Sequence, residues 1–172
     1  MKQKITPTGQ EKKLGADDFI VSKTDLKGKL TYCNRIFIDL AGYSESELLG
    51  QAHNIVRHPK MPRLIFKLLW DRVKAKKEIF AFVVNLCKDG GHYWVYANVT
   101  ASTDANGKVL GYYSVRRRPT QSAIDEIEKL YATLLQKEKS RGMQESKRYL
   151  DQLLSDKGVS YDEYVTQLQN GA

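Results

Sequence analysis

The chain has 172 residues, of which 41% are apolar and 28% charged, a composition typical of one globular domain with an accessory segment. No stretch reaches the ~18 apolar residues of a membrane-spanning helix, and the lysine-rich start has no apolar run behind it, which argues against a secretory signal. The formal net charge is +8, but the lysines are scattered and no helix-turn-helix, zinc-finger or RNA-recognition motif accompanies them, so we expect no nucleic-acid partner.

The N-terminal segment differs in composition from the rest of the chain. Residues 1–16 are polar and rich in lysine, which predicts a flexible arm. Runs of β-type residues come next, at 19–21 and 30–32, and the Asp25 and Gly28 between them are typical of a hairpin turn. We therefore expect the ordered domain to begin at residue 17.

Two short helices are expected next, each with a capping residue written in the sequence. Asn34 can cap the first helix, and Ser44 with Glu47 forms a capping box for the second. A linker then leads to a longer helix from Pro62, a residue that suits the first turn of a helix. The buried stripe of this helix is predicted to consist of Ile65, Leu68, Leu69 and Val73.

Three strand-like runs come after the long helix, at about 79–88, 92–102 and 109–118. The turns between them, 88–91 and 104–107, contain the Asp, Asn and Gly residues that tight hairpins favour. With the two earlier strands, this order predicts an α+β domain in which short helices cover one face of an antiparallel sheet.

The C-terminal part, 121–172, carries 7 Lys or Arg against 9 Asp or Glu, whereas residues 1–120 carry 21 against 11. It is predicted to form helices, the first of which ends near Gly142 and presents a narrow apolar seam at heptad-like spacing. This seam either packs on the chain's own domain or forms a signalling or dimerisation surface, because a short helix is marginal alone. The seam consists of Ile124, Ile127, Tyr131 and Leu134.

No motif for catalysis or metal binding stands out. The sequence has no glycine-rich dinucleotide motif, phosphate loop, His-Glu-x-x-His or nucleophile elbow. Its three histidines have no metal-ligand spacing with Cys33 and Cys87, although a single histidine can ligate haem. We therefore expect no enzyme, no catalytic residues and no metal site, and two cysteines suit a reducing cytoplasm.

Small polar residues inside apolar strands indicate a pocket. Asn85, Asn98 and Ser114 each interrupt one strand of the predicted meander, and an amide buried without a partner costs roughly 1–3 kcal/mol. Amides both donate and accept, so a flat heteroaromatic ligand would satisfy them. The alternative is that the two asparagines bind backbone groups at a bulge.

Two further pairs of residues carry the same ambiguity. Arg57 and His58 sit together in the linker, where an arginine fork would suit a pyrophosphate; alternatively they pair with carboxylates or face solvent. Phe66 and Trp70 share one helix face, and they form either plain core or one wall of a slot for a flat ring.

Several sequence blocks resemble the PAS domain of the aerotaxis receptor family. The run Tyr-Cys-Asn-Arg-Ile-Phe at 32–37 and Ala-Gly-Tyr-Ser at 41–44 are similar to the start of a PAS domain. The Val-Arg-His-Pro run at 56–59 and the His-Tyr-Trp-Val run at 92–95 are more specific, and the resemblance extends from about 17 to 130.

This resemblance implies a PAS domain at 17–120, with a five-stranded antiparallel sheet and short helices on one face, followed by a C-terminal helical extension at 121–172. It implies non-covalently bound FAD and a redox or energy-taxis signal to a chemotaxis transducer. The positions that match the family's flavin site are Asn34, His53, Arg57, His58, Trp70, Asn85, Trp94 and Asn98. The chain looks similar to the PAS component of a bipartite system, whose membrane-bound transducer is a separate chain. A homodimer would form through the N-terminal arm or the C-terminal helices.

Two departures from the family pattern bear on the cofactor. Lys60 stands where an aspartate associated with FAD binding is usual, and Ile79 stands where a tryptophan is usual. They leave two alternatives, a ligand-free PAS interaction module and a sensor of haem or another small ligand.

Overall fold

The structure is a computed structural model that describes residues 5–171. The strands are β1 (Ile20–Thr24), β2 (Leu30–Cys33), β3 (Ile79–Leu86), β4 (His92–Thr103) and β5 (Val109–Arg117). The helices are α1 (Arg35–Ala41), α2 (Glu45–Leu48), the 3-10 helix η1 (His53–Val56), α3 (Arg63–Lys74), α4 (Gln121–Arg141), α5 (Met143–Lys157) and α6 (Tyr161–Asn170). The strands form one antiparallel sheet in the order β2-β1-β5-β4-β3. The predicted α+β architecture is confirmed.

Local capping explains where the short helices begin. The Asn34 side chain accepts a hydrogen bond from the Phe37 N–H and so caps α1. Ser44 and Glu47 form the predicted capping box of α2. A second capping box begins α6, with the Ser160 side chain accepting from the Glu163 N–H. Each cap satisfies backbone donors that the first turn of a helix leaves free.

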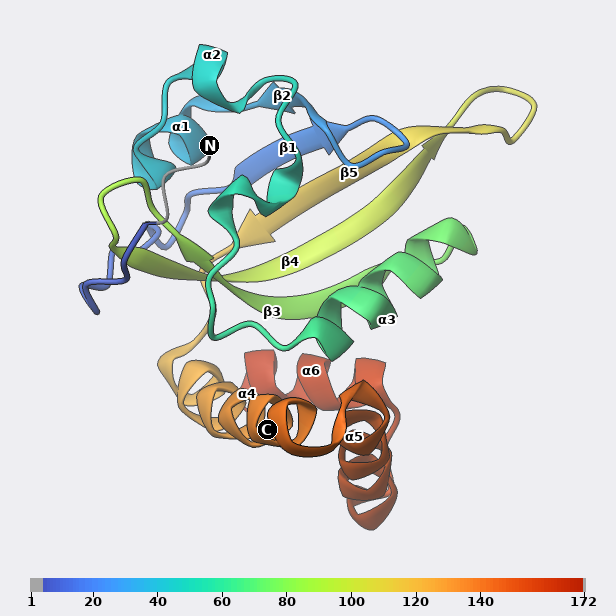
Figure 1. Cartoon of the computed structure of the whole chain (residues 1–172). Coiled ribbons are helices and arrows are strands. Elements are labelled where there is room, and N and C mark those ends of the chain that lie inside the picture. Colours follow the sequence, from blue (N-terminus) through green and yellow to red (C-terminus); the bar gives the residue numbers. More distant parts are fainter. Residues whose placement is uncertain (1–4, 172) are drawn as a thin grey trace.

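The two faces of the sheet are covered by different helices (Figure 1). One face, which we call the inner face, is covered by α1, α2, α3 and the linker with η1. The other, outer face is covered by α4–α6, which lie together. Because side chains alternate along a strand, successive residues of β4 enter different layers. The Ala97 and Val99 side chains face inward, whereas the Trp94 ring lies outward, 6.2 Å from the Tyr131 ring of α4.

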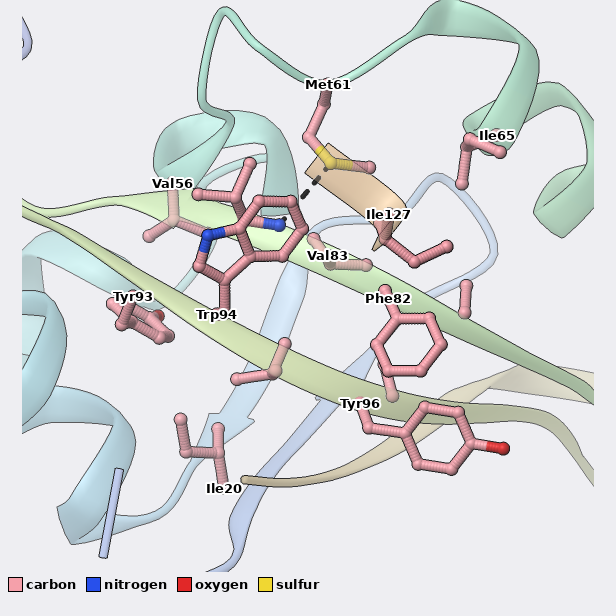
Figure 2. Packing of buried hydrophobic residues seen from close by; sticks show 14 of the residues in the cluster. Ile20, Val56, Met61, Ile65, Phe82, Val83, Tyr93, Trp94, Tyr96 and Ile127 are labelled. Atoms are coloured by element: carbon pink, nitrogen blue, oxygen red, sulfur yellow. Dashed lines mark hydrogen bonds between the residues drawn. The ribbon is translucent and has the colours of Figure 1, made fainter. Parts of the chain in front are cut away.

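The seam of α4 packs on the sheet of its own chain. Its four residues are all buried, and Ile127 is only 1% exposed. The Tyr131 hydroxyl donates a 2.7 Å hydrogen bond to the Phe82 carbonyl of β3. Figure 2 shows Ile127 above Phe82, in the cluster that also contains Trp94 and Tyr96. Of the two alternatives for the seam, the structure shows the docked one. Within 5–171, no helix combines the length and the apolar character needed to cross a membrane.

The free edge of β3 is also covered. The Val84 N–H donates to the Met61 sulfur at 3.4 Å (Figure 2), and Arg57 forms an isolated bridge with Asn85. Covering an edge strand in this way prevents its pairing with another chain. The same contacts fix the linker before α3 against the sheet.

The segment predicted as a flexible arm is hydrogen-bonded along much of its length. The Lys12 N–H donates to the His92 carbonyl at 2.7 Å, and the His92 N–H donates to the Gln10 carbonyl at 2.9 Å. Leu14 is buried. Backbone pairing of this kind leaves no pattern in the side chains, so the polar composition of the arm did not reveal it. Residues 1–4 of the predicted arm lie outside the described residues.

Candidate functional site

A cavity of about 280 Å³ lies between the inner face of the sheet and the segment formed by η1 and α3. This volume is close to the lower end of the roughly 300–1,000 Å³ range of small-molecule sites. One wall is aromatic and apolar and comes from α3, with Phe66, Leu69, Trp70 and Val73. The Trp70 ring meets the Tyr112 ring of β5 edge to face, with centroids 5.2 Å apart. The opposite surface comes from the sheet, where the polar residues Ser22, Asn85, Ser114 and Arg116 lie among apolar ones such as Val83, Ala97 and Val99.

Arg116 is the most unusual residue of this lining. It is 2% exposed, and its Nη2 donates to the Ser22 hydroxyl. Its Nε and Nη1 have no hydrogen-bond partner among the described residues. The guanidinium lies 4.7 Å from the centre of the Phe37 ring, and burial lowers the pKa of Arg116. Buried donors without partners are costly, so this side chain is suited to acceptor atoms of a ligand.

His53 lies beside Arg116 and is held from two sides. Its ring is stacked on Phe37 with a centroid separation of 5.9 Å, and its Nε2 is 3.2 Å from the Ser22 oxygen. Burial, with the neighbouring charge of Arg116, lowers the pKa of His53 to about 3. The imidazole is therefore neutral near pH 7, and a neutral imidazole carries one donor and one acceptor nitrogen.

Two exposed cations belong to the cavity lining, Lys27 of the β1–β2 turn and Arg57 of the linker. The Arg57 guanidinium lies 4.5 Å from the centre of the Phe66 ring, which fixes it over the α3 wall. Gly28, the neighbour of Lys27, lies against Trp70 so closely that an added Cβ would be 3.2 Å from the indole. The cavity therefore has an aromatic interior and a cationic mouth, an arrangement that suits a flat ring carrying phosphates.

The structure brings together half of the site residues expected from the sequence. His53, Arg57, Trp70 and Asn85 all line this one cavity, although they come from η1, the linker, α3 and β3. Asn85 is thus a polar residue in an otherwise apolar strand, and its side chain lies on the inner face of the sheet, where it lines the cavity.

Asn34 and His58 lie outside the cavity lining. The Asn34 amide is used within the fold, because its oxygen accepts from Val21 and Phe37 and its nitrogen donates to the Phe19 carbonyl. His58 is buried, its Nδ1 accepts from the Lys60 N–H, and its ring centre is 5.8 Å from that of His92. Both are structural contacts in this arrangement.

Trp94 and Asn98 are also outside the cavity, and the reason is strand parity. Both point to the outer face of β4, opposite Ala97 and Val99. The Trp94 ring packs near Tyr131, and the Asn98 amide nitrogen donates to Glu78 at 3.1 Å. The expectation that Asn98 and Asn85 meet one ligand does not hold in this structure.

Sequence reasoning missed Ser22 and Arg116 as site residues. Arg116 belongs to a run of three arginines, which is typical of a solvated strand end. Its alternation with Tyr112 and Ser114 was the available signal, since residues two apart on a strand share a face. All three line the cavity.

The two departures from the family pattern do not enter the cavity lining. The Lys60 ammonium pairs with Glu128 of α4 at 2.9 Å, and Ile79 is buried against Val73 and Val99. The cysteines are buried, and burial raises the pKa of each thiol to about 11. Across 5–171, no group of three or more His, Cys, Asp or Glu side chains is arranged to hold a metal ion.

Residues 30–116 match the PAS fold family. The aerotaxis receptor of Escherichia coli (strain K12) is 40% identical over 127 residues, which cover 74% of this chain and 25% of the receptor. The nitrogen fixation regulatory protein of Klebsiella pneumoniae is 28% identical over 97 residues, or 56% of this chain and 20% of that protein. The chain thus spans a quarter or less of the length of these relatives.

Solved structures agree on the fold. A light-oxygen-voltage domain studied with a flavin analogue has a TM-score of 0.57 and 21% identity, covering 64% of this chain and 83% of that one. The PAS domain of a protein from Colwellia psychrerythraea has a TM-score of 0.54 and 23% identity, covering 60% and 87%.

Proposed function

The chain belongs to the PAS-fold family, and on that premise we propose that it is a flavin-binding redox sensor, with FAD as its ligand. The observation that carries this proposal is Arg116, a buried cation with two unpaired donor nitrogens on the surface of a cavity with an aromatic wall. The similarity to an aerotaxis receptor and the fold shared with a light-oxygen-voltage domain support it.

The chemistry of the cavity suits an isoalloxazine ring. The ring is flat and apolar on its faces, which fits the wall that Phe66 and Trp70 form. Its edge carries carbonyl oxygens and ring nitrogens, which are acceptors for the free Nε and Nη1 of Arg116. Lys27 and Arg57 at the mouth would bind the pyrophosphate, which distinguishes FAD from flavins with fewer phosphates.

When bound, a flavin supplies reversible electron transfer that changes the charge and the proton count of its ring. Arg116 would then donate to an edge whose negative charge differs between the redox states, and a charge-assisted hydrogen bond is about twice as strong as a neutral one. His53 stays neutral at pH 7 and can donate or accept at the same edge. The Asn85 amide on β3 lines the same cavity and can either donate or accept a hydrogen bond. These three residues would bias the sheet between two packings.

The signal would reach a separate membrane-bound chemotaxis transducer from a cytoplasmic PAS protein. This part of the proposal rests on the aerotaxis receptor, which is 40% identical over the aligned region. The seam of α4 is not free to bind that partner, because it is buried against the sheet. A partner would instead contact the exposed surfaces of α4–α6 or the sheet.

A ligand-free module and a haem sensor fit the cavity less well. A ligand-free module would leave two buried arginine nitrogens without hydrogen-bond partners, which is costly. A haem sensor would need an imidazole nitrogen free for iron, whereas the His53 Nε2 contacts Ser22.

The test is a titration of ligand-free protein with FAD, FMN, riboflavin and haem, followed by gel filtration and absorption spectroscopy of the protein fraction. We expect retention in the order FAD, FMN, riboflavin, because each removal of phosphate removes partners of Lys27 and Arg57. Failure to retain any flavin would overturn the proposal, and a retained haem band would replace it.

A further inference from the structure

Helix α3, which forms one wall of the cavity, has no N-terminal capping side chain next to it in the sequence. Its N-cap residue is Pro62, which makes no side-chain capping bond, and its first turn contains no acidic residue. Its first residue is Arg63, whose positive charge is unfavourable at the positive end of a helix dipole. A helix of 12 residues is marginal in isolation. Its first turn therefore depends on groups from elsewhere in the chain.

The missing cap comes from α4. The Glu138 side chain is 4% exposed, and its Oε1 accepts from the Leu64 N–H at 2.9 Å. Its Oε2 accepts from the Arg63 N–H at 3.1 Å and from the Arg63 Nε at 3.4 Å. One carboxylate thus satisfies two free backbone donors and places a negative charge at the positive end of α3.

The cap acts on the part of α3 that lines the cavity. Phe66 is in the same first turn as Leu64, and Trp70 comes one turn later. Both rings line the cavity, and Phe66 also holds the Arg57 guanidinium. A displaced first turn would therefore shift the aromatic wall and one of the two cations at the mouth.

We propose that Glu138 is a positioning residue of the ligand site: by capping α3 from the C-terminal extension, it fixes the aromatic wall of the cavity. Docking of α4 and occupancy of the cavity then stabilise each other, since a coupling between two sites is reciprocal. The effect on α3 stands without any ligand, whereas the effect on FAD affinity rests on the proposed function.

The first test uses ligand-free protein. In a Trp94→Phe background, Trp70 is the only remaining tryptophan, and acrylamide quenching of its fluorescence measures its accessibility. Glu138→Ala is expected to raise the quenching constant. The matched control is Glu128→Ala, which removes an acidic residue of the same helix that pairs with Lys60 at 2.9 Å on the surface. The control should match the background protein.

The second test measures FAD affinity at a temperature at which circular dichroism shows each variant to be folded. Loss of a helix cap is expected to weaken binding by roughly two- to thirtyfold in Glu138→Ala. Glu138→Gln, whose amide oxygen can still accept from Leu64, is expected to fall between the wild type and Glu138→Ala. If Glu138→Ala does not fold, Glu138→Gln takes its place, and its quenching constant and FAD affinity are compared with those of Glu128→Ala in the same way.

Unchanged quenching together with unchanged FAD affinity would overturn the inference. Equal losses in Glu128→Ala and Glu138→Ala would also overturn it, because they would point to general loosening of α4. If the wild-type protein binds no flavin, the proposed function fails, and the quenching comparison alone decides the role of Glu138.

Discussion

The Arg116 guanidinium on β5 donates to the Ser22 hydroxyl on β1, and this is the only hydrogen bond that the described residues give it. Ser22 lies opposite Ser114 in the ladder, so the arginine reaches diagonally across the inner face of the sheet. A buried cation with unpaired donors destabilises a ligand-free fold. A bound group that supplied acceptors to these donors would remove this cost.

Replacement of this arginine should therefore have opposite effects on stability and on binding. In Arg116→Met, the ligand-free protein should be as stable as the wild type or more stable, by up to about 4 kcal/mol, since apolar replacement of a buried charge is often stabilising. FAD retention should be lost. Urea unfolding and bound-flavin absorbance measure the two quantities on one sample.

The control is Arg117→Met, one residue along β5, where the side chain is exposed on the outer face near Tyr96. It should retain FAD as the wild type does. A destabilised Arg116→Met that still retains flavin would show that the arginine serves the fold and not a ligand.

Gly28 should be needed for the shape of the cavity mouth. Its φ of +75° costs any other residue some strain, and an added Cβ would press on Trp70 at 3.2 Å. Gly50 has a similar φ of +78° and open space around it. Gly28→Ala should weaken FAD binding, whereas Gly50→Ala should lower stability by about 1 kcal/mol without affecting binding. Equal FAD affinities in the two variants would contradict this account of the mouth.

Two neutral histidines should make the fold sensitive to mild acid. Burial lowers the pKa of His53 to about 3 and that of His58 to about 4, below the ordinary 6.5. The unfolded chain therefore binds more protons below pH 6.5, and the free energy of unfolding should fall by up to about 1.4 kcal/mol per pH unit for each histidine. The stability is fully present above pH 6.5.

Urea unfolding near pH 7 and near pH 5 measures this loss. The window lies above the ordinary pKa of 4.5 of a glutamate, below which a carboxyl such as Glu47, whose pKa is lowered to about 2 in the folded protein, begins to lose its stabilising contribution. His58→Gln should show a shallower dependence on pH than the wild type. A wild-type protein equally stable at both pH values would exclude neutral buried histidines.

The docked seam predicts that its residues matter for folding. Ile127→Ala should lower the free energy of unfolding by about 2–5 kcal/mol, because Ile127 is 1% exposed and packs in the main core. Leu110, which is 58% exposed, offers the control, and its change to alanine should cost within about 0.5 kcal/mol. Similar small losses in both variants would mean that α4 does not dock on the sheet in solution.

The strands, the caps and the turns were predictable from the sequence because each depends on a few neighbouring residues. Asn34, Ser44 and Glu47 cap the helices that their spacing indicated. The faces of β4 are harder to predict in its first half, where Tyr93–Tyr96 are all apolar or aromatic and show no alternation. In its second half Ala97, Val99 and Ala101 alternate with Asn98, Thr100 and Ser102, and this alternation was the signal that separates Ala97 from Asn98.

Two charged residues show what local patterns miss. Arg116 lies in a run of arginines and Glu138 lies between two lysines, contexts typical of solvated surface. Each is buried only because a distant element covers it, α1 with Phe37 in one case and the start of α3 in the other. Such contacts depend on the tertiary arrangement, which residue spacing along the chain does not contain.

The most direct test of the central claim is a crystal structure of the protein grown with FAD. The account predicts an isoalloxazine ring in the cavity beside Trp70, with acceptor atoms about 2.7–3.2 Å from both Nε and Nη1 of Arg116. A flavin bound elsewhere, or one in the cavity that leaves both nitrogens of Arg116 unpaired, would contradict it.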